Sequence, residues 1–135
     1  MKKLVFILIT VLVLTGCQSK PLTGETIAVG NGSYKNVSSS ELNAMLKNKD
    51  FVFINVHIPF EGNIPGTDLS IPYDQIEQNL SQLPADKNAK ILLYCRSGRM
   101  SQIAAEKLVP LGYTNIWNLD GGMVVWEQAG YPLEK

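Results

Sequence analysis

Apolar and polar positions divide the chain into one apolar run near its start and a series of shorter apolar segments further on. Residues 4–14 (LVFILITVLVL) are apolar at ten of eleven positions and follow Lys2 and Lys3. Eleven residues are too few to span a bilayer stably, and a basic start before a short apolar run is typical of an export signal. The pattern therefore predicts that residues 1–16 are a signal peptide. The alternative is a short buried helix of the fold.

The residues that close this run, Leu14-Thr15-Gly16-Cys17, resemble a bacterial lipobox, in which cleavage precedes the cysteine. The resemblance implies that the sulfur of Cys17 receives a lipid, whose acyl chains bury CH₂ groups at about 0.8 kcal/mol each. Residues 17–40, which are polar and contain Gly and Pro, are then expected to be a lipidated N-terminus and tether, with a short strand at 26–29. The protein is expected outside the cytoplasm, attached to a membrane through Cys17.

Further along, near-continuous apolar runs alternate with helical patterns. Strands are expected at 51–56, 91–95 and 115–119. Helices are expected after the capping box Ser38-x-x-Glu41, at about 74–83, from about 101 to 110, and after Gly121-Gly122, with Asp120 as the N-cap of the last one. Such alternation predicts an α/β fold with a central, mainly parallel sheet flanked by helices, formed by residues 41–135.

Composition narrows the possible partners. The chain has 135 residues, with 12 Lys and Arg against 12 Asp and Glu, and only 18% of its residues are charged. Binding to nucleic acid needs a basic surface, so no nucleic-acid partner is expected. A single histidine and scattered carboxylates have no metal-ligand spacing, and the glycine pairs lack a nucleotide-binding pattern. Neither a metal nor a cofactor is expected.

The second cysteine, Cys95, lies where a predicted strand ends and a helix begins. With Cys17 lipidated, Cys95 has no disulfide partner, and no C-x-x-C pair is present for dithiol chemistry. A loop at a helix N-terminus points backbone N–H groups inward and stabilises a thiolate. Gly98 allows a tight curve, and Arg96 and Arg99 add positive charge. This pattern predicts a nucleophilic sulfur beside a bound anion. The alternative is an inert buried cysteine with two solvated arginines.

The segment from about residue 42 to 133 resembles a single rhodanese (sulfurtransferase) domain. Three blocks carry the resemblance: Ile64-Pro65-Gly66-Thr67 with Ile71-Pro72, then Leu93-Tyr94-Cys95-Arg96-Ser97-Gly98-Arg99-Met100-Ser101, and finally Gly112-Tyr113 with Leu119-Asp120-Gly121-Gly122, Trp126, Gly130 and Pro132. The resemblance implies a rhodanese-like three-layer fold and a Cys95 that accepts a sulfane sulfur as a persulfide. The substrate-binding residues would be Arg96, Ser97, Gly98, Arg99, Met100 and Ser101. The donor would be thiosulfate, a polysulfide or a persulfide, and the acceptor a small thiol, cyanide, sulfite or a thiol acceptor protein.

Three positions depart from the usual pattern of that family. Asn55-Val56-His57 stands where Asp-Val-Arg is common, and Gly62-Asn63 stands where Gly-His is common. Met100 replaces an Arg or Thr that often closes the cysteine loop in members that use thiosulfate. The first two changes remove a charged pair from the scaffold. The third removes an anion-binding group, which puts thiosulfate as the natural donor in doubt.

Three other functions compete with sulfur transfer. Cysteine phosphatases use Cys-x5-Arg, but the residue at that position is Ser101. A Cys–His hydrolase would use His57, the only histidine, which follows a predicted strand and could lie near Cys95. The third is a rhodanese module without turnover that acts in binding or as a sulfur carrier, with Trp117 and Trp126 serving only in packing.

Overall fold

A six-stranded sheet forms the centre of the protein. The computed structural model describes residues 24–135. The strand order is β1-β2-β6-β5-β3-β4. The strands are β1 (Glu25–Val29), β2 (Gly32–Val37), β3 (Val52–Asn55), β4 (Leu69–Ser70), β5 (Ile91–Tyr94) and β6 (Ile116–Leu119). Only the β1–β2 pair is antiparallel among these strands, and the other neighbours are parallel. The predicted mainly parallel sheet is confirmed.

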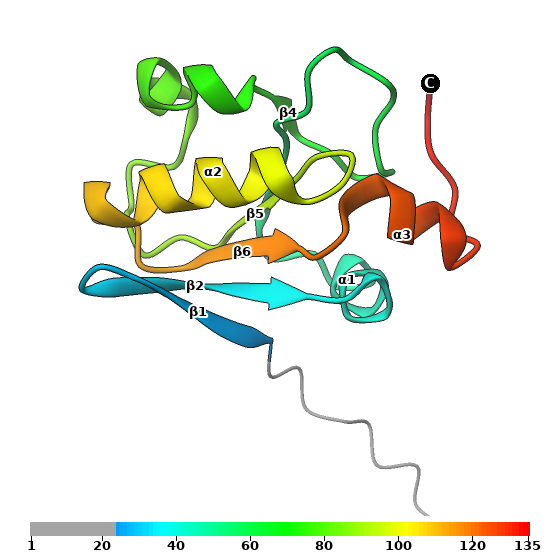
Figure 1. The fold of residues 1–135 in the computed structure, drawn as a ribbon, viewed down its shortest axis with the longest axis horizontal. Helices are drawn as coiled ribbons and strands as arrows, with labels where there is room; N and C mark the ends of the chain where they lie inside the picture. The colour runs from blue at the N-terminus through cyan, green and yellow to red at the C-terminus, as the bar shows by residue number, and fades with distance from the viewer. Residues whose placement is uncertain (1–23) are drawn as a thin grey trace, which may run out of the picture.

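Helices cover both faces of the sheet, as the alternating pattern predicts. They are α1 (Ser39–Leu46), α2 (Arg99–Leu108) and α3 (Gly122–Gln128), with 3₁₀ segments η1 (Tyr73–Gln75), η2 (Glu77–Gln82) and η3 (Val109–Leu111). One buried cluster joins the sheet to α2 and the 3₁₀ segments, and a second joins it to α1 and α3. Figure 1 shows α1 and α3 at the end of the sheet toward which the arrowheads of β2 and β6 point. The three-layer α/β architecture places the carboxyl ends of the parallel strands at that same edge.

The start of the folded domain differs from the prediction. The short strand expected at 26–29 is confirmed as β1, but a tether over the rest of residues 17–40 is wrong for 32–37, which form β2; together the two strands complete one side of the sheet. A two-residue turn at Gly30-Asn31 joins them, and β2 then pairs with β6 through Lys35, Asn36 and Val37. The predicted signal peptide and the lipidation site at Cys17 fall within residues 1–23, outside the described part of the chain. Between residues 24 and 135, no helix has both the length and the apolar character needed to cross a bilayer.

Local hydrogen bonding explains which predicted helices form. At α1 the capping box is present: the Glu41 N–H donates to Ser38 Oγ at 3.3 Å, and the Ser38 N–H donates to a Glu41 carboxylate oxygen at 2.8 Å. The helix expected at 74–83 is instead the pair η1 and η2. Asn79 interrupts it with φ −115° and ψ 22°, and its side-chain amide donates to the Gln75 carbonyl at 2.8 Å. A polar side chain that bonds the nearby backbone competes with regular helix formation.

The entry to α3 is also different from the prediction. Its N-cap is Gly121, with φ +76°, and no side chain caps the helix. Asp120 is exposed and its backbone N–H donates to the Val37 carbonyl at 2.9 Å, so the predicted N-cap role of Asp120 is wrong. Two consecutive glycines with positive φ, Gly121 and Gly122, turn the chain from β6 into α3.

Candidate functional site

Cys95 lies directly after β5, at the carboxyl edge of the sheet, and its exposed fraction is 0%. The chain turns through Arg96 and Ser97 to Gly98, whose φ of +96° is readily adopted only by glycine. This turn brings the Gly98 N–H to 3.0 Å from Cys95 Sγ, to which it donates. The helix α2 begins at the next residue. Strand end, tight turn and helix start therefore direct the Gly98 N–H at the sulfur atom.

Beneath the loop, Ser101 supplies a second donor to the same sulfur. Its buried hydroxyl lies 3.5 Å from Cys95 Sγ and 3.1 Å from the Gly98 carbonyl oxygen, and it can donate to either. A hydroxyl has one proton, so a negative charge on sulfur draws that proton away from the neutral carbonyl. Cys95, Gly98 and Ser101 thus form one hydrogen-bonded group that suits an anionic sulfur.

The N-terminus of α3 holds the other side of the loop. The Met123 N–H donates to the Cys95 carbonyl at 2.9 Å, and the Val124 N–H donates to the Arg96 carbonyl at 3.0 Å. In a trans peptide the carbonyl and the next N–H point in opposite directions. Because both carbonyls face α3, the N–H groups of Arg96 and Ser97 face away from α3. This orientation is needed if they are to bind an anion held at the cysteine loop.

Gly122 makes this close approach possible. A Cβ at that position would lie 2.4 Å from the Cys95 carbonyl oxygen and 2.6 Å from that of Arg96, and Gly122 has φ +60°. Any larger residue would collide with the backbone of the cysteine loop. Gly122 is therefore a structural requirement of the site, although the sequence pattern indicated only a turn there.

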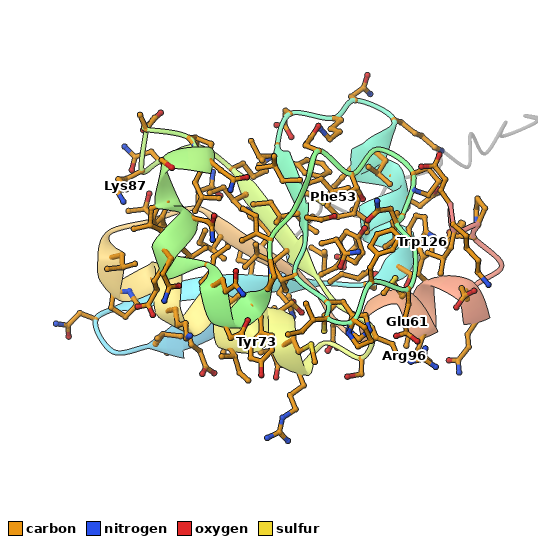
Figure 2. All side chains as sticks on the ribbon, turned by 90° about the horizontal axis from the view of Figure 1, so that it is seen from above. Phe53, Glu61, Tyr73, Lys87, Arg96 and Trp126 are labelled. Carbon is orange, nitrogen blue, oxygen red and sulfur yellow. The ribbon has the colours of Figure 1, made fainter. Side chains whose placement is uncertain are left out.

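The rim of the loop carries an ion-pair cluster that the sequence did not predict. Arg96 Nη1 lies 2.8 Å from Glu61 Oε1, and the other carboxylate oxygen of Glu61 binds His57 Nε2. Figure 2 shows Glu61 and Arg96 close together beside α3. The hydrogen bond from His57, aided by Arg96, lowers the pKa of Glu61 below its usual value. Glu61 lies 35 residues before Arg96, so no local spacing could have indicated the contact.

The other predicted substrate-binding residues differ in their surroundings. Ser97 and Arg99 are exposed at the rim, and Arg99 forms no ion pair with any residue between 24 and 135. Met100 is half-buried and packs against the core cluster on the α2 side of the sheet. It therefore lies on the core side of α2, whereas Ser97 and Arg99 face solvent.

His57 is occupied by a partner other than the cysteine. Its Nε2 binds Glu61, and its buried Nδ1 has no hydrogen-bond partner within the described part of the chain. Hydrogen bonds to Cys95 Sγ come from Gly98 and Ser101. The structure thus gives no support to a Cys–His hydrolase. Ser101, at the position of a phosphatase arginine, is buried beneath the loop and carries no charge.

A pair of neutral amide side chains, Asn55 and Asn63, stands where the usual family pattern has a charged pair. Asn55 Nδ2 donates to Asn63 Oδ1 and to the Gly62 carbonyl, both at 2.9 Å. Asn55 Oδ1 accepts from the His57 N–H, also at 2.9 Å. Asn55 and Asn63, which both depart from the family pattern, therefore bond to each other. Together they hold the loop that carries Glu61.

A pocket of about 410 Å³ adjoins the cysteine loop. Its charged lining residues are Glu61, Arg96, Glu127 and Lys135. The apolar side chains in its lining are Phe60, Met123, Val124 and Leu133. The volume falls in the range of small-molecule sites. In the region from residue 24 onward, no cluster of three or more His, Cys, Asp or Glu side chains could hold a metal ion.

Comparisons with known proteins agree with this architecture. Residues 38–129 match the family model described as "Rhodanese-like domain". A curated protein of Allochromatium vinosum named "Sulfurtransferase" is 33% identical over 88 residues, which is 63% of this chain and 79% of that protein. A tRNA uridine(34) hydroxylase of Erwinia tasmaniensis is 30% identical over 112 residues, which is 76% of this chain but only 31% of the relative.

A solved structure shows the same fold. The crystal structure of a rhodanese-related protein from Thermoplasma volcanium superposes with a TM-score of 0.64 at 29% identity, covering 74% of this chain and 97% of that one. The family match spans most of the chain, and strands β3 to β6, the cysteine loop and the α3 turn all lie within it. The chain therefore belongs to the rhodanese-like domain family, whose members act on sulfur-containing substrates.

Proposed function

We propose that this protein is a sulfurtransferase that carries a sulfane sulfur on Cys95. The observation that supports this most directly is the 3.0 Å hydrogen bond from the Gly98 N–H to Cys95 Sγ, at the start of α2. A backbone N–H aimed at sulfur stabilises a thiolate and, after reaction, a persulfide anion. The similarity to a protein named "Sulfurtransferase" supports the same reaction.

The reaction proceeds in two displacements. The Cys95 thiolate attacks the sulfane sulfur of the donor, a sulfur–sulfur bond to Cys95 forms, and the donor's own bond to that sulfur breaks. The leaving group, sulfite in the case of thiosulfate, departs with the electron pair. A nucleophilic acceptor, such as a thiolate or cyanide, then attacks the outer sulfur, and Cys95 leaves as a thiolate. Electrons balance without a cofactor.

Each loop residue has a role in this proposal. Cys95 is the nucleophile, and the N–H groups of residues 96–100 surround the transferred sulfur. Ser101 donates to the anionic sulfur, and Gly98 provides the turn. Arg96 and Arg99 supply positive charge at the rim, where Ser97 is also exposed, while Met100 keeps the start of α2 packed on the core.

The test is the mass of the protein after reaction. Incubation with thiosulfate, polysulfide or an organic persulfide should add the mass of one sulfur atom to the protein. The adduct should be removed by cyanide or a thiol, and Cys95→Ser should not form it. Cys95→Ser replaces the sulfur by oxygen with little change in volume, so its fold is expected to persist. A protein that takes up no sulfur from any of the three donors is not a sulfurtransferase.

A second candidate function is a rhodanese-type binding or sulfur-carrier module without turnover. The exposed fraction of 0% at Cys95 favours a module without rapid turnover, because small donors and acceptors reach Sγ only when neighbouring groups move. The two functions differ in the second displacement. A carrier module would keep its persulfide in the presence of small acceptors, whereas a sulfurtransferase would show multiple turnovers.

We also propose that the mature protein begins at Cys17 and is anchored outside the cytoplasm by lipid on that residue. The support is the order of charge, apolar run, small residues and cysteine in residues 2–17. Expression with a labelled fatty acid tests it. Label should follow the protein into the membrane fraction, and Cys17→Ser should lose the label. An unlabelled wild-type protein would refute the anchor.

A further inference from the structure

The charge at the mouth of the cysteine loop is lower than its two arginines suggest. Arg96 is paired with Glu61 at 2.8 Å, and the same carboxylate also binds His57. Met100 adds no charge to the loop, because its side chain is apolar and packs against the core. Among the residues that the structure describes, Arg99 is then the loop cation without an ion pair. A dianionic donor such as thiosulfate must therefore compete with Glu61 for Arg96.

Apolar surface lies beside this neutralised rim. Phe60 precedes Glu61 and is 60% exposed, which makes it the most exposed large apolar side chain in the described part of the chain. With Met123, Val124 and Leu133 it lines the pocket of about 410 Å³, whose charged lining residues, Arg96 and Lys135 against Glu61 and Glu127, are equal in number. Val124 is fixed against the loop, because its N–H donates to the Arg96 carbonyl. The apolar surface is thus held next to the residue that follows Cys95.

We infer that Glu61 and this pocket select an organic persulfide with an apolar substituent as the sulfur donor, in preference to a dianionic oxyanion donor. This inference rests on the proposed sulfur transfer by Cys95. The substituent R of R–S–SH lies in the pocket against Phe60 and Val124. The Cys95 thiolate attacks the terminal sulfur, the new sulfur–sulfur bond forms, and R–S⁻ leaves with the electrons of the broken bond and is protonated by solvent.

Glu61 acts here through Arg96, so it is a positioning residue, and Glu61→Gln tests it. Glutamine keeps the shape and one acceptor oxygen but removes the charge that neutralises Arg96. We expect kcat/KM for thiosulfate to rise about threefold to fivefold, the size of an exposed ion-pair effect. In contrast, kcat/KM for benzyl persulfide should change by less than about twofold, because this donor does not depend on Arg96 for binding. Glu127→Gln is the matched control, because Glu127 lines the same pocket but has no ion pair among residues 24–135.

The pocket is tested by comparing two persulfides that differ only in their substituent. Wild-type protein should use benzyl persulfide with a KM about tenfold lower than that for methyl persulfide, because a buried aromatic ring removes more apolar surface from water. Phe60→Ser should abolish most of that difference. Leu111→Ser is the matched control, since Leu111 is a 40% exposed apolar residue outside the pocket.

The outcomes separate this inference from the proposed function. If no donor adds sulfur to Cys95, the sulfurtransferase proposal itself fails. If Cys95 forms a persulfide but thiosulfate is the better donor in wild-type protein, the inference is wrong and the proposed function stands. Equal effects of Glu61→Gln and Glu127→Gln on the thiosulfate rate, or equal use of the two persulfides, would also overturn it. In an Arg96→Gln background, Glu61→Gln should no longer change the thiosulfate rate, and a persistent effect would show that Glu61 does not act through Arg96.

Discussion

The backbone N–H of Met123 donates a hydrogen bond to the carbonyl oxygen of Cys95 at 2.9 Å. This contact joins the first turn of α3 to the residue after β5, and the two residues lie 28 positions apart in the chain (123 − 95). It fixes the direction of the peptide after Cys95, so the loop's N–H groups do not depend on a bound ligand for their orientation. Preorganised donors of this kind cost little rearrangement when charge develops on the sulfur.

Gly122→Ala should disrupt this arrangement. The added methyl group would lie 2.4 Å from the Cys95 carbonyl oxygen, and the residue would be forced to keep φ +60°. We expect a loss of about 3 kcal/mol or more in the free energy of unfolding, since a backbone collision is added to conformational strain. Persulfide formation on Cys95 should fall with it. Chemical denaturation and mass spectrometry measure the two effects.

Gly130→Ala isolates the conformational part of that cost. Gly130 also has positive φ, +85°, but a Cβ there meets nothing within 4 Å. It should therefore destabilise the protein by only about 1 kcal/mol and leave persulfide formation unchanged. Equal losses for the two alanine variants would mean that Gly122 is needed only for its backbone conformation.

Ser101→Ala should slow sulfur transfer without unfolding the protein. The hydroxyl lies 3.5 Å from Cys95 Sγ, and its removal takes one donor from the anionic sulfur. We expect the rate of persulfide formation to fall about tenfold, equivalent to about 1.4 kcal/mol. Ser97→Ala is the control, because Ser97 is exposed and its hydroxyl has no contact with Sγ. A Ser101→Ala protein with the wild-type rate would remove Ser101 from the site.

Much of the sheet was predictable because its strands are buried on both faces. Every residue of 91–94 and 116–119 is buried, so these strands appear in the sequence as nearly continuous apolar runs, with Asn118 as the polar residue. The strand at 26–29 was expected, but its partner β2 and the hairpin that they form were not, because both strands are partly exposed and lack such a run. The signal was its two-residue Gly30-Asn31 turn, which is typical of a β-hairpin.

The candidate site was predictable only where it is local in sequence. The loop from Cys95 to Ser101 is one continuous segment between a strand and a helix, so its composition indicated both its shape and its chemistry. Glu61 and Gly122 act on that loop from distant segments. Their roles depend on which residues the topology brings together at the sheet edge, and a single sequence carries no signal for an ion pair 35 residues apart.

Tyr94→Phe should destabilise the protein through a buried amide. The Tyr94 hydroxyl accepts from the Ile64 N–H at 3.0 Å and lies 2.6 Å from Thr67 Oγ1. Burial raises the pKa of Tyr94 although these hydrogen bonds oppose the shift. Without the hydroxyl, the Ile64 N–H loses its partner, at a cost of about 1–3 kcal/mol in the free energy of unfolding.

Tyr34→Phe provides the comparison for that measurement. Tyr34 is also buried, at 3% exposure, but no hydrogen bond joins its hydroxyl to another residue of the described chain. Removing the Tyr34 hydroxyl should change the free energy of unfolding by less than about 0.5 kcal/mol. If both phenylalanine variants unfold at the same denaturant concentration, the Tyr94 hydroxyl does not stabilise the segment that begins at Ile64.

Asp68→Asn should reduce the loss of stability in acid. Partial burial raises the pKa of Asp68, but hydrogen bonds from Lys49 Nζ at 2.6 Å and the Phe53 N–H at 2.8 Å outweigh it, and the pKa is lowered. A carboxylate with a lowered pKa stabilises the fold above its unfolded-state pKa of about 3.9. That contribution disappears as the pH falls through the lowered folded-state value. The side chain is 42% exposed, so we expect less than about 1 kcal/mol at pH 7.

Denaturation of wild-type protein and Asp68→Asn between about pH 7 and pH 2 measures this effect across the unfolded-state pKa. The difference between the two proteins should be largest at the upper end and should shrink in acid as Asp68 becomes protonated. Asp50→Asn is the matched control: the hydrogen bond from Lys90 lowers the pKa of Asp50 too, but Asp50 is 66% exposed and receives no N–H from a strand. Its effect should be smaller at every pH, because solvent screens an exposed pair more strongly. A difference for Asp68→Asn that grows toward low pH would mean that its carboxylate destabilises the fold.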